Sequence, residues 1–270
     1  MSLMLCRQEN AEHPFYLDVL GVNIYTSQEL CYVIYHHPLL VLDDFVDDHL
    51  IDFIREELNM ANLAGRLEKW KKSEENQDEL LLIILQECFY YRPSEVNDFR
   101  QHIVGLRKKH SAEYSKLRAD YLFGLRQYGR AVPIYEKCLE FPRDGYVNDE
   151  FLGKIWCNMG SCYARMFQSE KAVRAFEKAY YYLKDIAVIQ KMYYMTILNP
   201  KLSLKEKFGA AATAEQKKAW DEELAGAREH ASQSESVQSL ERLFEKDPLK
   251  RTSGAARLIH QWKQEYRNMI

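Results

Sequence analysis

Two segments of the chain repeat one order of small and large residues, and this repetition limits the fold more than any other feature of the sequence. In each segment a large aromatic residue stands between two small ones and is followed directly by a Glu-Lys pair. At helical spacing, small residues let two helices cross closely while large residues fill the space beside the crossing. We therefore predict two helical hairpins. The repeated positions are Ala131, Tyr135 and Cys138 in residues 114–144, and Ala172, Phe176 and Ala179 in residues 155–184.

The second segment also carries a set of large and small residues in the first helix of its hairpin. These are Trp156, Met159, Gly160 and Tyr163. Together with the second helix they resemble the signature of the tetratricopeptide repeat (TPR), with Met in place of the usual Leu. The first segment resembles it in degenerate form, because Ala119 stands at the Gly position and Ser115 at the Trp position. The two hairpins are further apart than the usual repeat of about 34 residues, so the turn at 141–150 must hold an insertion.

The resemblance implies an all-α fold, a right-handed array of helical hairpins or α-solenoid. The chain's 11 Gly and 7 Pro in 270 residues agree with long helices,. We expect the repeat core at 111–200, with 185–198 as a capping helix because Tyr194 replaces the glycine of the close crossing. A mostly helical region is expected at 1–110 and a C-terminal helical segment at 201–270.

The N-terminal region contains one segment with β character and one that is apolar almost all round. Residues from Phe15 to Tyr25 are rich in aromatic and branched side chains but are broken by Gly21, which indicates a short extended piece or a hairpin,. Residues 78–91 are predicted to form a helix that is buried on most sides.

TPR proteins use the inner face of each first helix as a peptide groove, and the resemblance assigns that face to seven polar residues here. The Lys and Arg residues could hold acidic side chains or a terminal carboxylate, and Asn158 could bond the backbone of an extended ligand. The alternative is that all of them are ordinary solvated side chains. The groove candidates are Lys116, Asp120, Lys154, Asn158, Ser161, Arg165 and Lys191.

Charge is distributed unevenly along the chain. Residues 1–60 hold eleven acidic and two basic residues, a balance of −9, whereas residues 246–270 have a balance of +4. This asymmetry can support end-to-end association of copies of the chain, so a homo-oligomer is possible. It can also support docking to a charged partner. The alternative is two solvated faces of opposite sign.

A final helix at about 253–270 should place Leu258, Ile259, Trp262 and Tyr266 on one stripe. This stripe could cover the open end of the array or dock onto a partner.

Several classes of protein find no support in the sequence. A net charge of −3 makes no case for nucleic acid or an anionic membrane,, and the longest apolar run, Leu80 to Leu85, is far below the roughly 20 residues of a membrane span. No Cys-x2-Cys pair or zinc spacing occurs,. The acidic run from Asp43 to Asp48 lacks the spacing of a calcium loop and reads as a solvated helix start. We therefore expect no metal, no cofactor and a cytoplasmic location.

The sequence favours a non-catalytic adaptor that binds a protein or peptide through its TPR-like repeats. A peptide-sensing regulator with an N-terminal effector region is an alternative, although the −9 balance argues against DNA binding by that region. An enzyme with a helical active site is a third, since active sites can be assembled from distant residues even though no catalytic motif appears.

Overall fold

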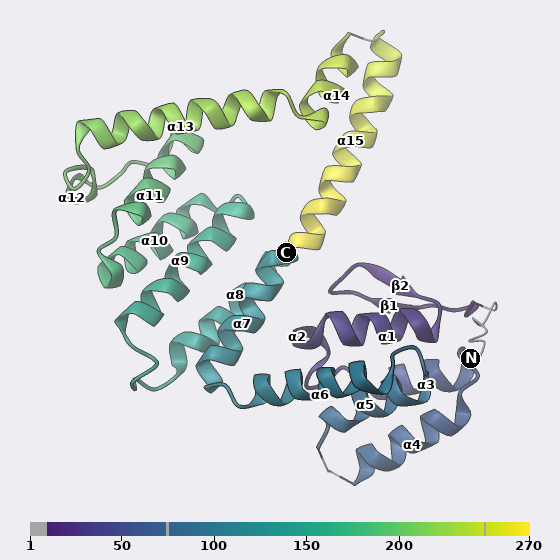
Figure 1. Ribbon diagram of the computed structural model, residues 1–270. Helices are drawn as coiled ribbons and strands as arrows, with labels where there is room; N and C mark the ends of the chain where they lie inside the picture. Colours follow the sequence, from purple (N-terminus) through teal and green to yellow (C-terminus); the bar gives the residue numbers. More distant parts are fainter. Residues whose placement is uncertain (1–9, 74–75, 246) are drawn as a thin grey trace. The chain divides into compact units, whose positions relative to one another are not determined.

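The computed structural model describes residues 10–73, 76–245 and 247–270. Met1–Glu9 (with Cys6), Glu74–Glu75 and Lys246 lie outside the described residues. The described chain is helical except for one two-stranded sheet (Figure 1), which confirms the predicted all-α array with a short β piece. It divides into two compact units, Met1–Tyr121 and Leu122–Ile270. None of the described helices is long and apolar enough to cross a lipid bilayer.

The N-terminal unit begins with a β-hairpin and continues with packed helices. Its strands are antiparallel and pair Phe15 with Ile24, and the turn between them contains Gly21 at a φ of 66°, a left-handed conformation that favours glycine,. The elements are β1 (Phe15–Leu17), β2 (Val22–Ile24), α1 (Ser27–His36), α2 (Pro38–Val41), α3 (Asp48–Glu56), α4 (Ala61–Lys72), α5 (Asp78–Glu87) and α6 (Pro93–Arg107), while α7 (Ser111–Gly124) spans the division between the units.

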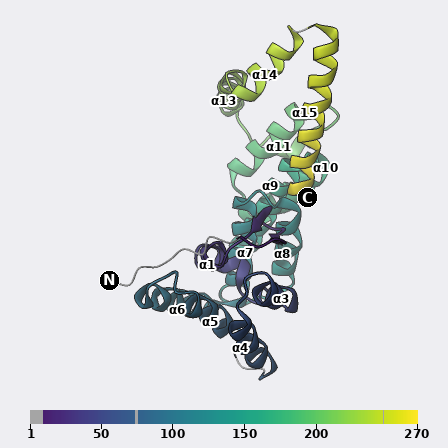
Figure 2. The ribbon, with the colours of Figure 1, turned by 90° about the vertical axis from the view of Figure 1, so that its right-hand side faces the viewer.

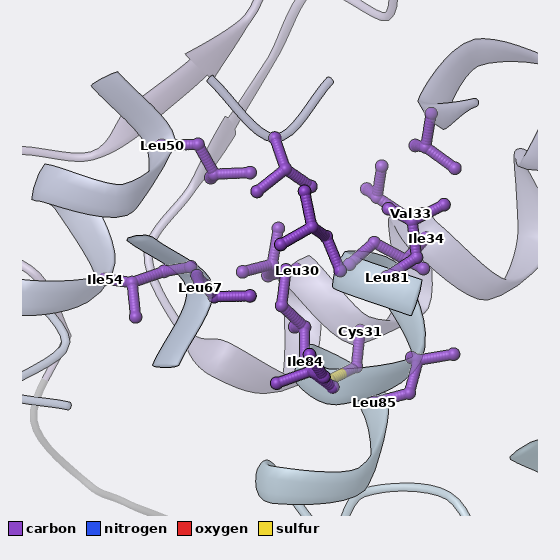
Figure 3. Close-up of a cluster of buried hydrophobic side chains, with 14 of the residues drawn as sticks. Leu30, Cys31, Val33, Ile34, Leu50, Ile54, Leu67, Leu81, Ile84 and Leu85 are labelled. Carbon is purple, nitrogen blue, oxygen red and sulfur yellow. The ribbon is translucent and has the colours of Figure 1, made fainter. Parts of the chain in front are cut away.

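Helix α5 lies at the centre of the N-terminal unit. All six residues from Leu80 to Leu85 are buried, as expected of a helix buried on most sides,. The helix nevertheless ends at Glu87, four residues before the predicted end, and Phe89 beyond it is 72% exposed. Figure 3 shows Leu81, Ile84 and Leu85 of α5 beside Leu30 and Cys31 of α1. Helices α3 and α4 contribute to the same core, so α5 connects the surrounding helices.

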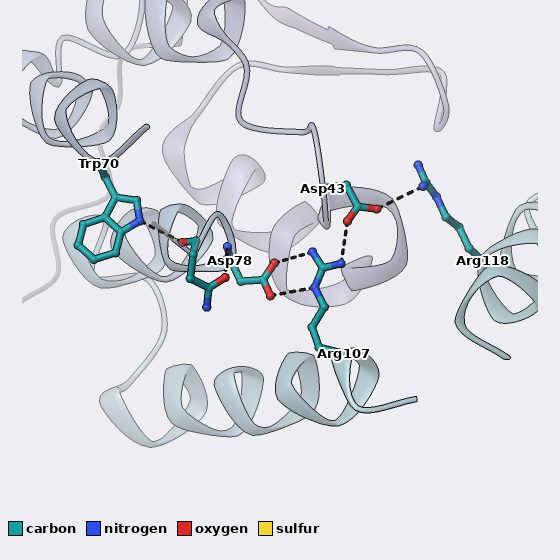
Figure 4. Close-up of polar contacts among 6 residues, drawn as sticks. Asp43, Trp70, Asp78, Arg107 and Arg118 are labelled. Carbon is teal, nitrogen blue, oxygen red and sulfur yellow. Dashed lines mark hydrogen bonds and ion pairs between the residues drawn. The ribbon is translucent and has the colours of Figure 1, made fainter. Parts of the chain in front are cut away.

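A network of charged side chains holds the N-terminal end of α5. Asp78 is buried, with 7% of its surface exposed, and receives hydrogen bonds from Arg107 Nε at 3.0 Å and Nη2 at 2.7 Å. The third nitrogen of Arg107 donates to Asp43 at 2.8 Å, and Arg118 reaches the same carboxylate at 3.3 Å (Figure 4). Bonding to Asp78, and then to Asp43, raises the pKa of Arg107 above its ordinary value. The guanidinium therefore joins α6, α5 and the loop after α2.

The acidic run that precedes α3 is used for capping and surface pairing. Asp47 accepts a hydrogen bond from the backbone N–H of Leu50 at 2.8 Å, and Asp48 pairs with Lys71 at 2.8 Å. In the described ranges no three His, Cys, Asp or Glu side chains converge as they would in a metal site.

The C-terminal unit is a series of helices that begins in the repeat segment (Figures 1 and 2). Asn148 caps α9 by accepting from Phe151 N at 2.9 Å, and Thr213 and Gln216 form a capping box at the start of α13,. The last helix starts five residues before the predicted position, because Asp247 caps it and Pro248 fits its first turn,. The elements are α8 (Tyr128–Glu140), α9 (Asp149–Arg165), α10 (Ser169–Leu183), α11 (Ile186–Leu198), α12 (Glu206–Gly209), α13 (Ala214–Ser232), α14 (Glu235–Phe244) and α15 (Pro248–Met269).

We predict that Arg107→Met lowers the free energy of unfolding of the N-terminal unit by about 2 kcal/mol. Removing one partner of a fully buried ion pair costs about 3–5 kcal/mol, and the value is smaller here because solvent reaches part of the Arg107 side chain,. The measurement is denaturant-dependent hydrogen exchange of the α5 amides, which reports on this unit alone.

Lys108→Met is the matched control, because Lys108 is exposed one residue further on. Adding Asp78→Asn to Arg107→Met should recover part of the loss, since a neutral amide needs no counter-charge. Equal effects of Arg107→Met and Lys108→Met would contradict the assigned role of the network.

Candidate peptide-binding surface

The hairpin of α9 and α10 is held together by a close crossing at Gly160. A Cβ atom at this position would lie 2.5 Å from Cε1 of Phe176, so the aromatic ring occupies the space that any other residue would need,. Phe176 is buried, and Ala172 and Ala179 on either side of it have no exposed surface. These are the small and large positions on which the hairpin was predicted.

The next helix, α11, makes a different contact with the helix that covers it. Tyr194 stands in the register of Gly160, and its Oη donates to the backbone oxygen of Trp220 at 3.3 Å and bonds Glu223 at 3.0 Å. The ring of Tyr193 lies 5.7 Å from that of Trp220. The aromatic rings therefore fill the space between α11 and α13, and α11 is itself covered by α13 rather than lying at the end of the packed helices.

Three of the predicted groove residues lie along one face of α9. Lys154, Ser161 and Arg165 are seven and four residues apart, a spacing that places them on one side of a helix,. Lys154 and Arg165 are exposed, and Lys154 pairs with Glu150 on its own helix. Ser161 Oγ donates to the backbone oxygen of Cys157 at 3.0 Å.

Lys191 of α11 joins this face from the neighbouring helix. Its Nζ lies 3.0 Å from Sγ of Cys157 and 5.8 Å from the ring centre of Phe176. The contact places a third cation between Lys154 and Arg165 along α9. Sequence reasoning missed Cys157, although its position three residues after Lys154 puts it on the same face. The resulting surface, the α9 cationic face, consists of Lys154, Cys157, Ser161, Arg165 and Lys191.

The remaining candidates are engaged by other side chains of the described chain. Asn158 is partly buried, and its Nδ2 donates to Oη of Tyr135 on α8 at 3.4 Å, so the amide is directed at the preceding helix. Lys116 and Asp120 belong to α7 and pair with each other one turn apart, which neutralises both charges,.

The fold is that of a helical-repeat protein. A family model described as tetratricopeptide repeat matches residues 153–182, which is the hairpin of α9 and α10. This hairpin is a tetratricopeptide repeat, as its sequence pattern predicted. Comparison with curated proteins and with solved structures gives no significant match.

We predict that Gly160→Ala destabilises the C-terminal unit by about 1–2 kcal/mol. Overpacking a core costs about 1–3 kcal/mol, and the better helix propensity of Ala returns only part of this, about 1 kcal/mol. Urea unfolding followed by circular dichroism measures the change.

Gly226→Ala is the control, because a Cβ atom there would meet nothing within 4 Å. This change in α13 should stabilise by up to about 1 kcal/mol through helix propensity alone. If Gly160→Ala stabilised the protein equally, the close crossing with Phe176 would not exist.

Proposed function

We propose that this protein is a non-catalytic adaptor whose α9 cationic face binds an acidic segment of a partner protein. The observation that carries the proposal is that Lys154 and Arg165 lie on one face of α9, and that Lys191 of α11 contacts Cys157 between them. The TPR match to this hairpin supports it, because such repeats are protein-interaction modules,.

The chemistry of the face favours carboxylates as ligands. Glu150 already pairs with Lys154, but Arg165 and Lys191 are exposed and form no ion pair with another residue of the described chain. Hydrogen bonds from charged donors to carboxylates are stronger than those between neutral groups, and a guanidinium can bond both carboxylate oxygens at once. An acidic side chain or a terminal carboxylate of an extended peptide is therefore the preferred ligand.

The face also has the rigidity that specific binding needs. Its side chains project from two helices whose packing is fixed by the buried residues Phe176, Ile189 and Met192. Cations held on rigid elements lose less conformational freedom on binding than cations on loops.

The proposal places the adaptor in the cytoplasm, since no disulfide bond joins the five cysteines of the described residues,.

The test is a selection of random peptides on the immobilised full chain, followed by measurement of dissociation constants by fluorescence anisotropy. We expect enrichment of peptides with clustered Asp or Glu residues. Arg165→Glu combined with Lys191→Glu should weaken these peptides at least about tenfold, because charge-assisted hydrogen bonds are replaced by repulsion.

The matched control is Arg174→Glu, a charge reversal at an exposed position of α10 outside the α9 cationic face. It should leave the dissociation constants within a factor of about two. The proposal fails if no acidic peptide is enriched, or if the selected peptides bind the double variant as tightly as the wild type.

A further inference from the structure

Helix α15 presents an apolar stripe that the rest of the described chain covers only in part: Ile259 and Trp262 are exposed, whereas Leu258, Tyr266 and Met269 are half-buried. None of its 22 residues is buried. Ile259 and Trp262, at the middle of the stripe, are 47% and 46% exposed. The stripe consists of Leu258, Ile259, Trp262, Tyr266 and Met269, which follow one side of the helix,.

Both ends of α15 are nevertheless attached to its own unit. Tyr266 Oη donates to the backbone oxygen of Met166 at 3.3 Å, and the backbone of Ile270 lies against Gly129 of α8. At the other end, Gly254 lies against Leu243 of α14. Figures 1 and 2 show α15 in yellow between these two attachments. The helix is thus held in place with its central apolar residues facing solvent, an arrangement that commonly marks an interaction surface.

The polar sides of α15 are strongly basic. The helix contains five cations and the single acidic residue Glu265, a net charge of +4. A partner must therefore offer apolar contacts for the stripe and negative charge around it. The cations are Lys250, Arg251, Arg257, Lys263 and Arg267.

The N-terminal unit of the same protein has the complementary properties. Its residues 10–60 hold ten acidic residues and only Arg55 as a basic one, a balance of −9. Arg107 and Arg118 at Asp43, and Lys71 at Asp48, reduce this balance to −6, so the segment stays acidic. The same segment exposes Tyr16 of the β-hairpin and Tyr32 of α1, which are 55% and 51% exposed. Tyrosine is enriched where protein surfaces meet, because its ring packs while its hydroxyl stays hydrated.

We propose that α15 of one molecule docks on the acidic N-terminal unit of a second copy of this chain. The two surfaces are different, so the contact is head to tail and each molecule can both donate a helix and accept one. Such contacts build open chains unless the geometry closes a ring. This association does not depend on ligand binding at the α9 cationic face.

Two charge-reversed variants of the full chain test the proposal by analytical ultracentrifugation. The tail variant carries Arg257→Glu, Lys263→Glu and Arg267→Glu. The head variant carries Glu12→Lys, Asp44→Lys and Glu56→Lys, three exposed carboxylates that cap no helix and bridge no cation among the described residues. Circular dichroism checks that both variants keep the helical content of the wild type.

We expect the mean mass of the wild type to rise between about 1 µM and 200 µM, and to fall again at about 0.5 M salt. Each variant alone should stay monomeric. A mixture of the two should associate at concentrations at which each variant alone stays monomeric, because the intact helix of the head variant can dock on the intact acidic surface of the tail variant. A wild type that stays monomeric throughout overturns the proposal, as does self-association that either variant retains.

A second pair of variants tests the apolar part of the contact. Trp262→Ala should weaken the association at least about tenfold, as expected for a central aromatic contact. Leu249→Ala is the control, because Leu249 is exposed on the same helix outside the stripe. Equal effects of the two changes would overturn the assignment of the stripe. Pelleting with phosphatidylserine vesicles by a protein that stays monomeric would assign α15 to a membrane surface instead, and would also overturn the proposal.

Discussion

The close crossing of α9 and α10 sets the arrangement of the C-terminal unit. Because Gly160 has no side chain, the ring of Phe176 lies against the backbone of α9 and is buried. Phe176, Ala172 and Ala179 of α10 then form one continuous core with Val188, Ile189 and Met192 of α11. This packing is what brings Lys191 within 3.0 Å of Cys157. A steric condition at one glycine thus determines which cations share the α9 cationic face.

The N-terminal unit depends on a polar constraint instead. Its central helix α5 is apolar, so hydrophobic burial explains its stability but does not fix where the helix begins or how it is oriented. Arg107 donates hydrogen bonds to both Asp78 and Asp43, and these directed contacts fix the N-terminal end of α5,. Asp43 adopts a φ of 75°, an uncommon conformation for a residue with a side chain, and its carboxylate is held by Arg107 and Arg118,.

Local patterns predicted the elements well, whereas side-chain partners distant in the sequence could not be predicted. The repeat hairpin, the β-hairpin around Gly21 and the buried α5 all follow from spacing and composition within short segments. Asp78 and Arg107 are paired across separate helices, and no local pattern indicates that contact. Family position also placed Asn158 in the groove, and it is four residues from Lys154 and seven from Arg165, on the same side of α9,. Its amide, however, is bonded to Tyr135 of α8, a contact that no local pattern indicates.

The two proposed surfaces differ in how electrostatics acts on them. Ligand binding at the α9 cationic face relies on Arg165 and Lys191. The affinity for an acidic peptide should therefore decrease steeply as added salt screens these charges. The α15 surface combines its cations with Trp262 and Ile259, and the burial of apolar area is insensitive to moderate salt. For α15, charge should contribute to both the rate of encounter and the affinity, while the apolar stripe adds to the lifetime of the contact. In the proposed contact with a second copy, the stripe of α15 can add apolar contacts to the exposed Tyr16 and Tyr32, which the α9 cationic face cannot. This difference is the physical reason for assigning the second copy to α15 and leaving the α9 cationic face to a peptide ligand.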